Sequence, residues 1–94
     1  PGEPFQRVQL AKVVYNVFQG AGVKVDGDLG ARRPIDMGAR HLSLRAVLFT
    51  LGRGLMRKTG RGDFFPLGSV SGLEAIETLE RVKRLLFPLG LYRG

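Results

Sequence analysis

The chain has 94 residues and a net charge of +7, and we take residues 1–94 as one small domain, complete or part of a larger protein. Its 44% of hydrophobic and 24% of charged residues are typical of a globular protein and exclude a disordered chain. The absence of cysteine excludes disulfides and thiolate metal sites, and the absence of a run of about 18 apolar residues excludes a membrane-spanning helix.

The first predicted element is a helix over residues 4–19. Pro4 suits the first helical turn, where its missing N–H is not needed, and Gly20 supplies the stop. Apolar side chains cover well over half of the helix circumference, which is more than the roughly 100° stripe of a surface helix. This breadth is one reason to expect that the chain self-associates or lies inside a larger complex.

Residues 20–37 are predicted to be irregular. Residues 23–27 (Val-Lys-Val-Asp-Gly) are compatible with one arm of a short β-hairpin. Residues 32–34 (Arg-Arg-Pro) are expected to be extended, because the residue before a proline is disfavoured in the helical region.

The central predicted element is a helix over residues 38–58, with one apolar stripe at helical spacing and a second on its other side. The first stripe consists of Leu44, Val47, Leu48, Leu51 and Leu55, and the second of Leu42, Phe49 and Met56. A helix that is apolar on two sides is normally sandwiched between partners, so we expect the second stripe to form an interface. Gly52 and Gly54 each lower helix stability by about 1 kcal/mol relative to alanine, and either allow a close backbone approach or end the helix early.

A loop over residues 59–70 leads to a third predicted helix, over residues 72–87. The clearest local signal is a capping box, in which the Ser71 side chain accepts the Glu74 N–H and the Glu74 carboxylate accepts the Ser71 N–H. The side chains expected to be buried are Leu73, Ile76, Leu79, Val82 and Leu86. The ion pairs expected on the exposed side are Glu77–Arg81 and Glu80–Arg84. Because these two arginines have local partners, we expect them to be poor ligand contacts.

The string Phe-Pro-Leu-Gly occurs twice, at residues 65–68 and 87–90. In one interpretation both copies are turns whose Phe and Leu anchor the chain to the core. In the other, the second copy begins an apolar tail that docks on a partner. The predicted tail contacts are Phe87, Leu89, Leu91 and Tyr92.

The positive charge is concentrated in residues 31–61. This segment has eight cationic side chains, seven of them arginine, and Asp36 as its one acid, whereas each flanking segment is neutral. A guanidinium group binds phosphate or carboxylate through two parallel hydrogen bonds and stacks on bases. The segment is therefore a candidate polyanion-binding surface, with contact to an acidic partner protein or a merely solvated face as the alternatives. The candidate contact residues are Arg32, Arg33, Arg40, Arg53, Arg57, Lys58 and Arg61.

The sequence offers little for catalysis or cofactor binding. His41 is the one histidine and there is no cysteine, so neither a Cys–His pair nor a multi-histidine metal site can form within the chain. Asp26, Asp28 and Asp36 could hold Mg²⁺, but acids beside arginines usually form salt bridges. We expect no enzyme activity, no cofactor and no metal site.

The fold prediction is all-α: three helices joined by Gly/Pro-rich loops, with room for one short hairpin, in a homo-oligomer or larger complex. The first functional hypothesis is a non-enzymatic module that binds nucleic acid (RNA or DNA) or another polyanion through its arginine-rich segment. The second is a structural subunit of a macromolecular assembly, such as a viral or phage particle or a ribosome-like complex, that acts through protein interfaces. No membrane partner is expected, because no helix combines a cationic face with a single clean apolar one.

Overall fold

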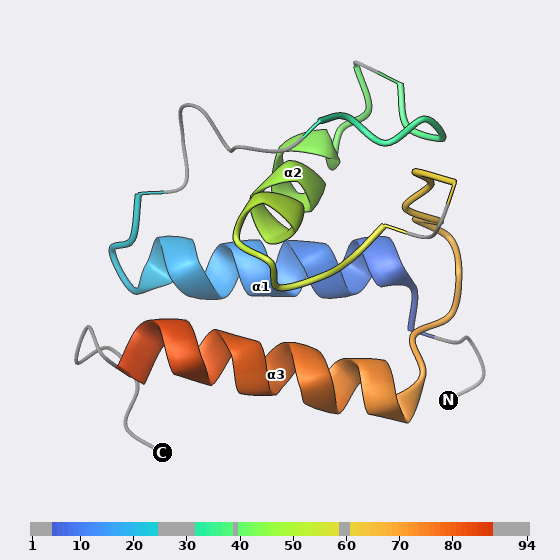
Figure 1. Cartoon of the computed structure of the whole chain (residues 1–94). Helices are drawn as coiled ribbons and strands as arrows, with labels where there is room; N and C mark the ends of the chain where they lie inside the picture. The colour runs from blue at the N-terminus through green and yellow to red at the C-terminus, as the bar shows by residue number, and fades with distance from the viewer. Residues whose placement is uncertain (1–4, 25–31, 39, 59–60, 88–94) are drawn as a thin grey trace.

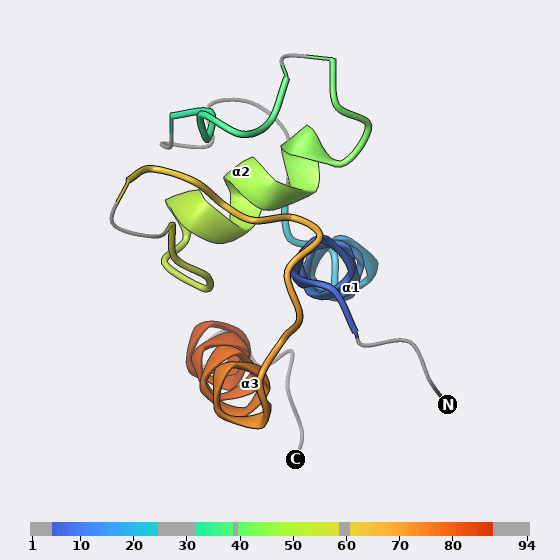
Figure 2. The same ribbon diagram turned by 90° about the vertical axis from the view of Figure 1, so that its right-hand side faces the viewer.

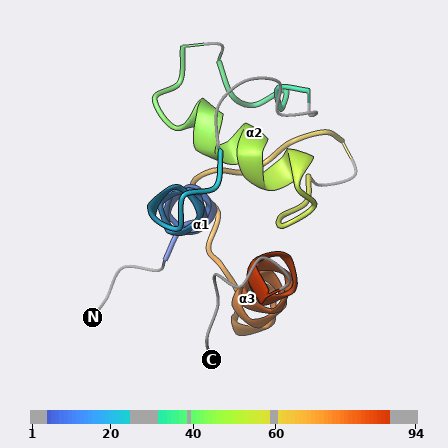
Figure 3. The same cartoon turned by 90° about the vertical axis from the view of Figure 1, so that its left-hand side faces the viewer.

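The computed structural model describes residues 5–24, 32–38, 40–58 and 61–87. Within these residues the chain forms three helices and no strand: α1 (Arg7–Gly20), α2 (Leu44–Gly52) and α3 (Gly72–Leu86). Figure 1 shows α1 and α3 running in the same direction, with α2 crossing over α1. Figures 2 and 3 look along α1 and α3 from their two ends and show the three helices as the corners of a triangle. The all-α prediction is confirmed for the described residues.

The first helix ends in a cap that replaces part of the predicted hairpin. Gly22 has a φ of 83°, which is the left-handed region that glycine adopts without strain. The Val23 N–H then donates to the Phe18 carbonyl at 3.0 Å, and both side chains contribute to the core. Val23 therefore caps α1 instead of starting a hairpin, and residues 25–27 lie outside the described residues.

The central helix is much shorter than the predicted span of residues 38–58, because it begins only at Leu44 and ends at a glycine cap. Gly54 has a φ of 71°, and its N–H donates to the Leu51 carbonyl at 3.1 Å. The Leu55 N–H donates to the Thr50 carbonyl at 2.8 Å, which completes the double hydrogen bond typical of a helix C-terminus. Of the two roles considered for the glycines, ending the helix early is confirmed.

The core lies between the three helices and includes side chains from the loops. Phe49 of α2 is its centre, because its ring contacts the rings of Tyr15 and Phe18 edge-on at centroid distances of 5.8 and 5.3 Å. The other buried apolar side chains include Leu10, Ala11, Val14, Met37, Val47, Leu55, Met56, Phe64, Val82 and Leu86.

The predicted interface stripe on the central helix is wrong for two of its three residues. Phe49 and Met56 are 0% and 2% exposed, so both fill the interior of this chain and are inaccessible to a partner. The reason is that α2 stops at Gly52 and the chain then turns inward, so the two side chains do not share an outer helix face. Leu42 and Phe87 are exposed as expected. The remaining predicted interface residues, Leu89, Leu91 and Tyr92, lie outside the described residues.

The third helix has almost the predicted bounds, but it is rotated about its axis. Three side chains predicted to be buried are exposed: Leu73 (68%), Ile76 (61%) and Leu79 (53%). The buried face consists instead of Thr78, Val82 and Leu86, which follow Glu74 at intervals of four residues. Glu74 is bonded to Arg7 of α1, and this contact fixes which face of α3 turns inward. Half of the predicted capping box is confirmed, because the Ser71 hydroxyl accepts the Glu74 N–H at 3.0 Å. The other half is wrong for the described residues: the Glu74 carboxylate binds Arg7 and does not accept the Ser71 N–H.

Candidate functional site

A buried arginine at the N-terminal end of α1 joins this helix to α3 and to the segment that follows α2. Arg7 is only 8% exposed, and its guanidinium lies 4.4 Å from the centroid of the Phe64 ring. Its Nε donates to Glu74 Oε2 at 2.9 Å, its Nη2 to the Arg57 carbonyl at 2.6 Å, and its Nη1 to the Phe64 carbonyl. Arg7 therefore holds the backbone at Arg57, in the arginine-rich segment of residues 31–61, close to α3. No local pattern predicts this role, because these partners are 50 to 67 positions away in the chain.

Asp36, the one acid of residues 31–61, is bound by backbone N–H groups. Asp36 Oδ1 accepts the Phe64 N–H at 2.8 Å, and Oδ2 accepts the Phe65 N–H at 2.7 Å. Desolvation raises the pKa of Asp36, but these hydrogen bonds and the positive charge of Arg7 outweigh it, so the pKa lies below its usual 3.8. Asp36 thus acts as a structural carboxylate. Asp26 and Asp28 lie outside the described residues, and within the described part of the chain no group of three His, Asp or Glu side chains could hold a metal ion.

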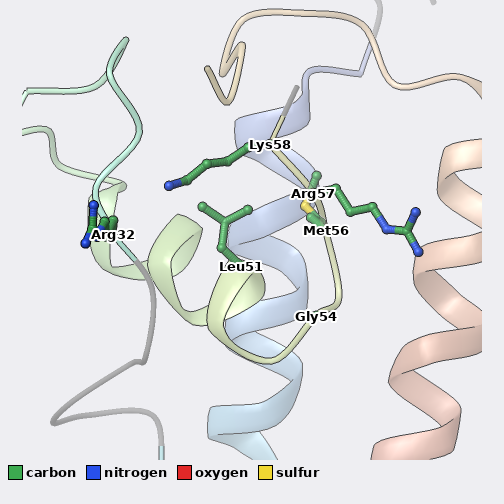
Figure 4. Close-up of a pocket in the computed structure, with 6 residues that line it drawn as sticks. All are labelled: Arg32, Leu51, Gly54, Met56, Arg57 and Lys58. Atoms are coloured by element: carbon green, nitrogen blue, oxygen red, sulfur yellow. The ribbon is translucent and has the colours of Figure 1, made fainter. Parts of the chain in front are cut away.

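A pocket of about 500 Å³ lies beside the C-terminal end of α2. Its lining consists of Arg32, Leu51, Gly54, Met56, Arg57 and Lys58. Figure 4 shows that Lys58 extends past Leu51 toward Arg32, whereas Arg57 extends in the other direction, toward α3. The Lys58 and Arg32 side chains therefore face a common space, and Arg57 directs its charge toward α3.

A second pocket, of about 170 Å³, lies where the end of α2 approaches α3. Its lining consists of Arg53, Gly54, Leu55, Arg81, Arg84 and Leu85. Arg81 Nη1 donates to the Leu55 carbonyl at 3.4 Å, which ties α3 to the turn after α2. The Arg53 guanidinium lies 5.4 Å from the centroid of the Phe49 ring, a cation–π distance that orients this exposed side chain.

The expected ion pairs of α3 are present in part. Arg81 Nη2 lies 4.0 Å from Glu77 Oε2, as the spacing predicted. Glu80 Oε1 lies 3.9 Å from Lys83 Nζ, so in the described part of the chain Glu80 pairs with Lys83 and not with Arg84. The expectation that both arginines are locally occupied holds for Arg81 alone. Arg84 is exposed and lines the second pocket.

The two pockets are adjacent, because Gly54 lines both. Together they form what we call the basic surface, whose cationic residues are Arg32, Arg53, Arg57, Lys58, Arg81 and Arg84. Among the described lining residues of both pockets there is no acid. Four of the seven predicted contact residues are thus brought together, and α3 supplies two that the sequence argument had set aside. The other three predicted contacts, Arg33, Arg40 and Arg61, are exposed but line neither pocket.

Comparisons of the chain with protein-family models, with curated proteins and with solved structures give no match. In the described residues, no helix has the length and apolar character needed to cross a bilayer. The function must therefore be inferred from the basic surface itself.

Proposed function

We propose that the chain is a non-enzymatic module that binds nucleic acid or a similar polyanion through the basic surface. The observation that carries the proposal is the grouping of six cationic side chains, from three separate segments, around two adjacent pockets. Cations spaced in this way suit a chain of phosphates, each of which a guanidinium group binds through two hydrogen bonds. Contacts to phosphates supply affinity without reading sequence, so little base selectivity is expected.

The apolar residues between the cations fit the same ligand class. Leu51 of the first pocket and Leu85 of the second are accessible to solvent, whereas Met56 and Leu55 are buried beneath the two pockets. Accessible apolar side chains beside cations can contact unpaired bases while the cations bind the phosphates. Single-stranded nucleic acid is therefore expected to bind more tightly than a duplex of the same length.

The test is fluorescence anisotropy with labelled single-stranded RNA, single-stranded DNA, duplex DNA and a heparin oligosaccharide, repeated over a range of salt concentrations. Binding to the single strands should weaken steeply with salt, with a slope of about 0.7 log units per phosphate neutralised. Binding whose affinity does not depend on salt would overturn the proposal, as would the absence of binding to all four probes at low salt.

A pair of double variants distinguishes binding at the basic surface from a general effect of the net charge of the chain. Arg53→Gln with Arg84→Gln removes two cations of the basic surface, and Arg40→Gln with Arg61→Gln removes two exposed cations outside it. The first variant should lower affinity by about tenfold or more and reduce the salt slope by about 1.4, and the second should change both far less. Equal losses in the two variants would show that only net charge matters.

A structural role in an assembly is the second candidate. Its original argument is weakened, because Phe49 and Met56 are buried in the core. The observation that favours it is the row of exposed apolar side chains on α3. Loss of an oligomer in variants of α3, with polyanion binding absent in the wild type, would favour this candidate.

A further inference from the structure

The second pocket of the basic surface is small and adjoins the first. Its volume is about 170 Å³, below the roughly 300–1,000 Å³ of a site that encloses an organic ligand, whereas the first pocket, at about 500 Å³, lies within that range. Gly54 lines both pockets, and the space at the position of its missing Cβ is open. A small group held in the second pocket can therefore belong to a larger molecule whose next part lies over the first.

Two of the three arginines that line the second pocket have no carboxylate partner in the described chain. Arg81 is occupied, because its Nη2 lies 4.0 Å from Glu77 Oε2. Arg53 and Arg84 are both exposed, and neither forms an ion pair with an acid of the described residues. The Arg53 guanidinium lies 5.4 Å from the centroid of the buried Phe49 ring, which restricts its direction. The pocket thus has two positive charges that no described acid neutralises.

Two unpaired guanidinium groups at one small pocket match an anion with two negative charges. Each internal phosphate of a nucleic-acid strand is a diester with a single charge, whereas a phosphate at the end of the strand is a monoester with a charge of about −1.5 to −2 near neutral pH. The monoester also has three free oxygens, which supply enough acceptors for two guanidinium groups. We propose that the second pocket, through Arg53 and Arg84, binds the terminal phosphate of a single-stranded nucleic acid.

In this arrangement the rest of the strand lies over the first pocket. Lys58 and Arg32 face a common space there, and Arg57 extends toward α3 (Figure 4). These three cations are separate from the pair at the second pocket, so they are available to the internal phosphates. The inference rests on the proposed function, since it assigns one end of the same polyanion to one part of the basic surface. It can fail while the proposed function stands.

The first test is isothermal titration calorimetry of the full chain with three unlabelled single strands. One strand ends in a phosphate, the second ends in the methyl ester of that phosphate, and the third ends in a hydroxyl and is two nucleotides longer, so that its total charge equals that of the first. Two sets are made, one for each end of the strand. In at least one set the first strand should bind about fivefold more tightly than the other two, because only its end carries a second charge for the two arginines.

Equal affinities of the three strands in both sets would overturn the inference and leave the proposed function intact. The absence of binding by every strand at low salt would overturn both.

The second test locates the preference with two double variants. Arg53→Gln with Arg84→Gln should bring the phosphorylated and methylated strands to equal affinity. Arg32→Gln with Lys58→Gln is the matched control, because it removes the same charge from the first pocket, and it should weaken both strands alike and keep the ratio at about fivefold. Loss of the preference in both double variants, or in neither, would contradict the assignment. Circular dichroism checks that the variants are folded, and Arg84→Gln alone should reduce the preference to about twofold.

A nucleoside monophosphate distinguishes a strand end from a free phosphate ester. It carries the same terminal group but cannot occupy the cations of the first pocket at the same time, so it should bind about tenfold or more weakly than the phosphorylated strand. An affinity equal to that of the strand would mean that a free phosphate monoester is the ligand, and would overturn the assignment to a strand end.

Discussion

Removing the guanidinium of Arg7 is the most informative perturbation of the fold. The side chain is buried and bonds Glu74, the Arg57 carbonyl and the Phe64 carbonyl. Arg7→Ala leaves two backbone acceptors and a carboxylate without their donor. A buried acceptor that loses its partner costs about 1–2 kcal/mol, and the partly exposed Glu74 adds about 1 kcal/mol. The free energy of unfolding should therefore fall by about 3–5 kcal/mol.

That loss is large for a protein of this length, whose total free energy of unfolding is about 5–14 kcal/mol. The assay is urea denaturation followed by far-UV circular dichroism, with Arg40→Ala as the control at an exposed arginine. Arg7→Lys keeps the charge but cannot bond all three partners at once, so it should cost about 2 kcal/mol. Glu74→Gln, which removes only the ion pair, should cost about 1 kcal/mol.

The order of these variants is what checks the reasoning. If Arg7→Ala and Arg40→Ala cost the same, the buried network contributes nothing to stability. If Arg7→Lys is as stable as the wild type, the planar geometry of the guanidinium is irrelevant and charge alone matters.

Three further predictions concern single residues. Thr78→Val should raise the free energy of unfolding by about 1 kcal/mol in urea denaturation, because the buried Thr78 hydroxyl has no hydrogen-bond partner among the described residues. Thr50→Val should not, since the Thr50 hydroxyl donates to the Val47 carbonyl. Phe65 has a φ of 56°, so Phe65→Asn should stabilise the fold by about 0.5–1 kcal/mol, and the same change at the similarly exposed Phe5 should not. Asp36 has a lowered pKa, so its contribution to stability is present above about pH 4 and is lost as the pH falls through the folded-state value. The stability difference between the wild type and Asp36→Asn should accordingly shrink in acid, and a difference that stays constant between pH 6 and about pH 2.5 would contradict this.

Local signals were sufficient to predict most of the secondary structure. The Ser71 cap and the periodic apolar residues after it gave α3 almost to the residue, because both depend on neighbours within one helical turn. The C-terminal end of α2 could not be predicted from local signals. Gly54 can either continue a helix at a cost in stability or reverse the chain in the left-handed region. Tertiary contacts of Leu55 and Met56 in the core decide for the reversal.

The orientation of α3 could not be predicted from periodicity. The apolar row of Leu73, Ile76 and Leu79 indicated the inner face, but the bond between Arg7 and Glu74 turns the helix toward Thr78 and Val82 instead. The same long-range bond explains why two arginines of α3 were missed as members of the basic surface. No pattern within one segment reveals a contact between residues 67 positions apart.

The bond between Arg7 and Glu74 also constrains how this chain can change over evolutionary time. Losing either partner alone leaves a charge with little solvent around it, so single substitutions at these two positions should be selected against. A joint replacement by two apolar side chains removes that charge penalty, although the Arg57 and Phe64 carbonyls still lose their donor. In related chains the identities at positions 7 and 74 should therefore vary together.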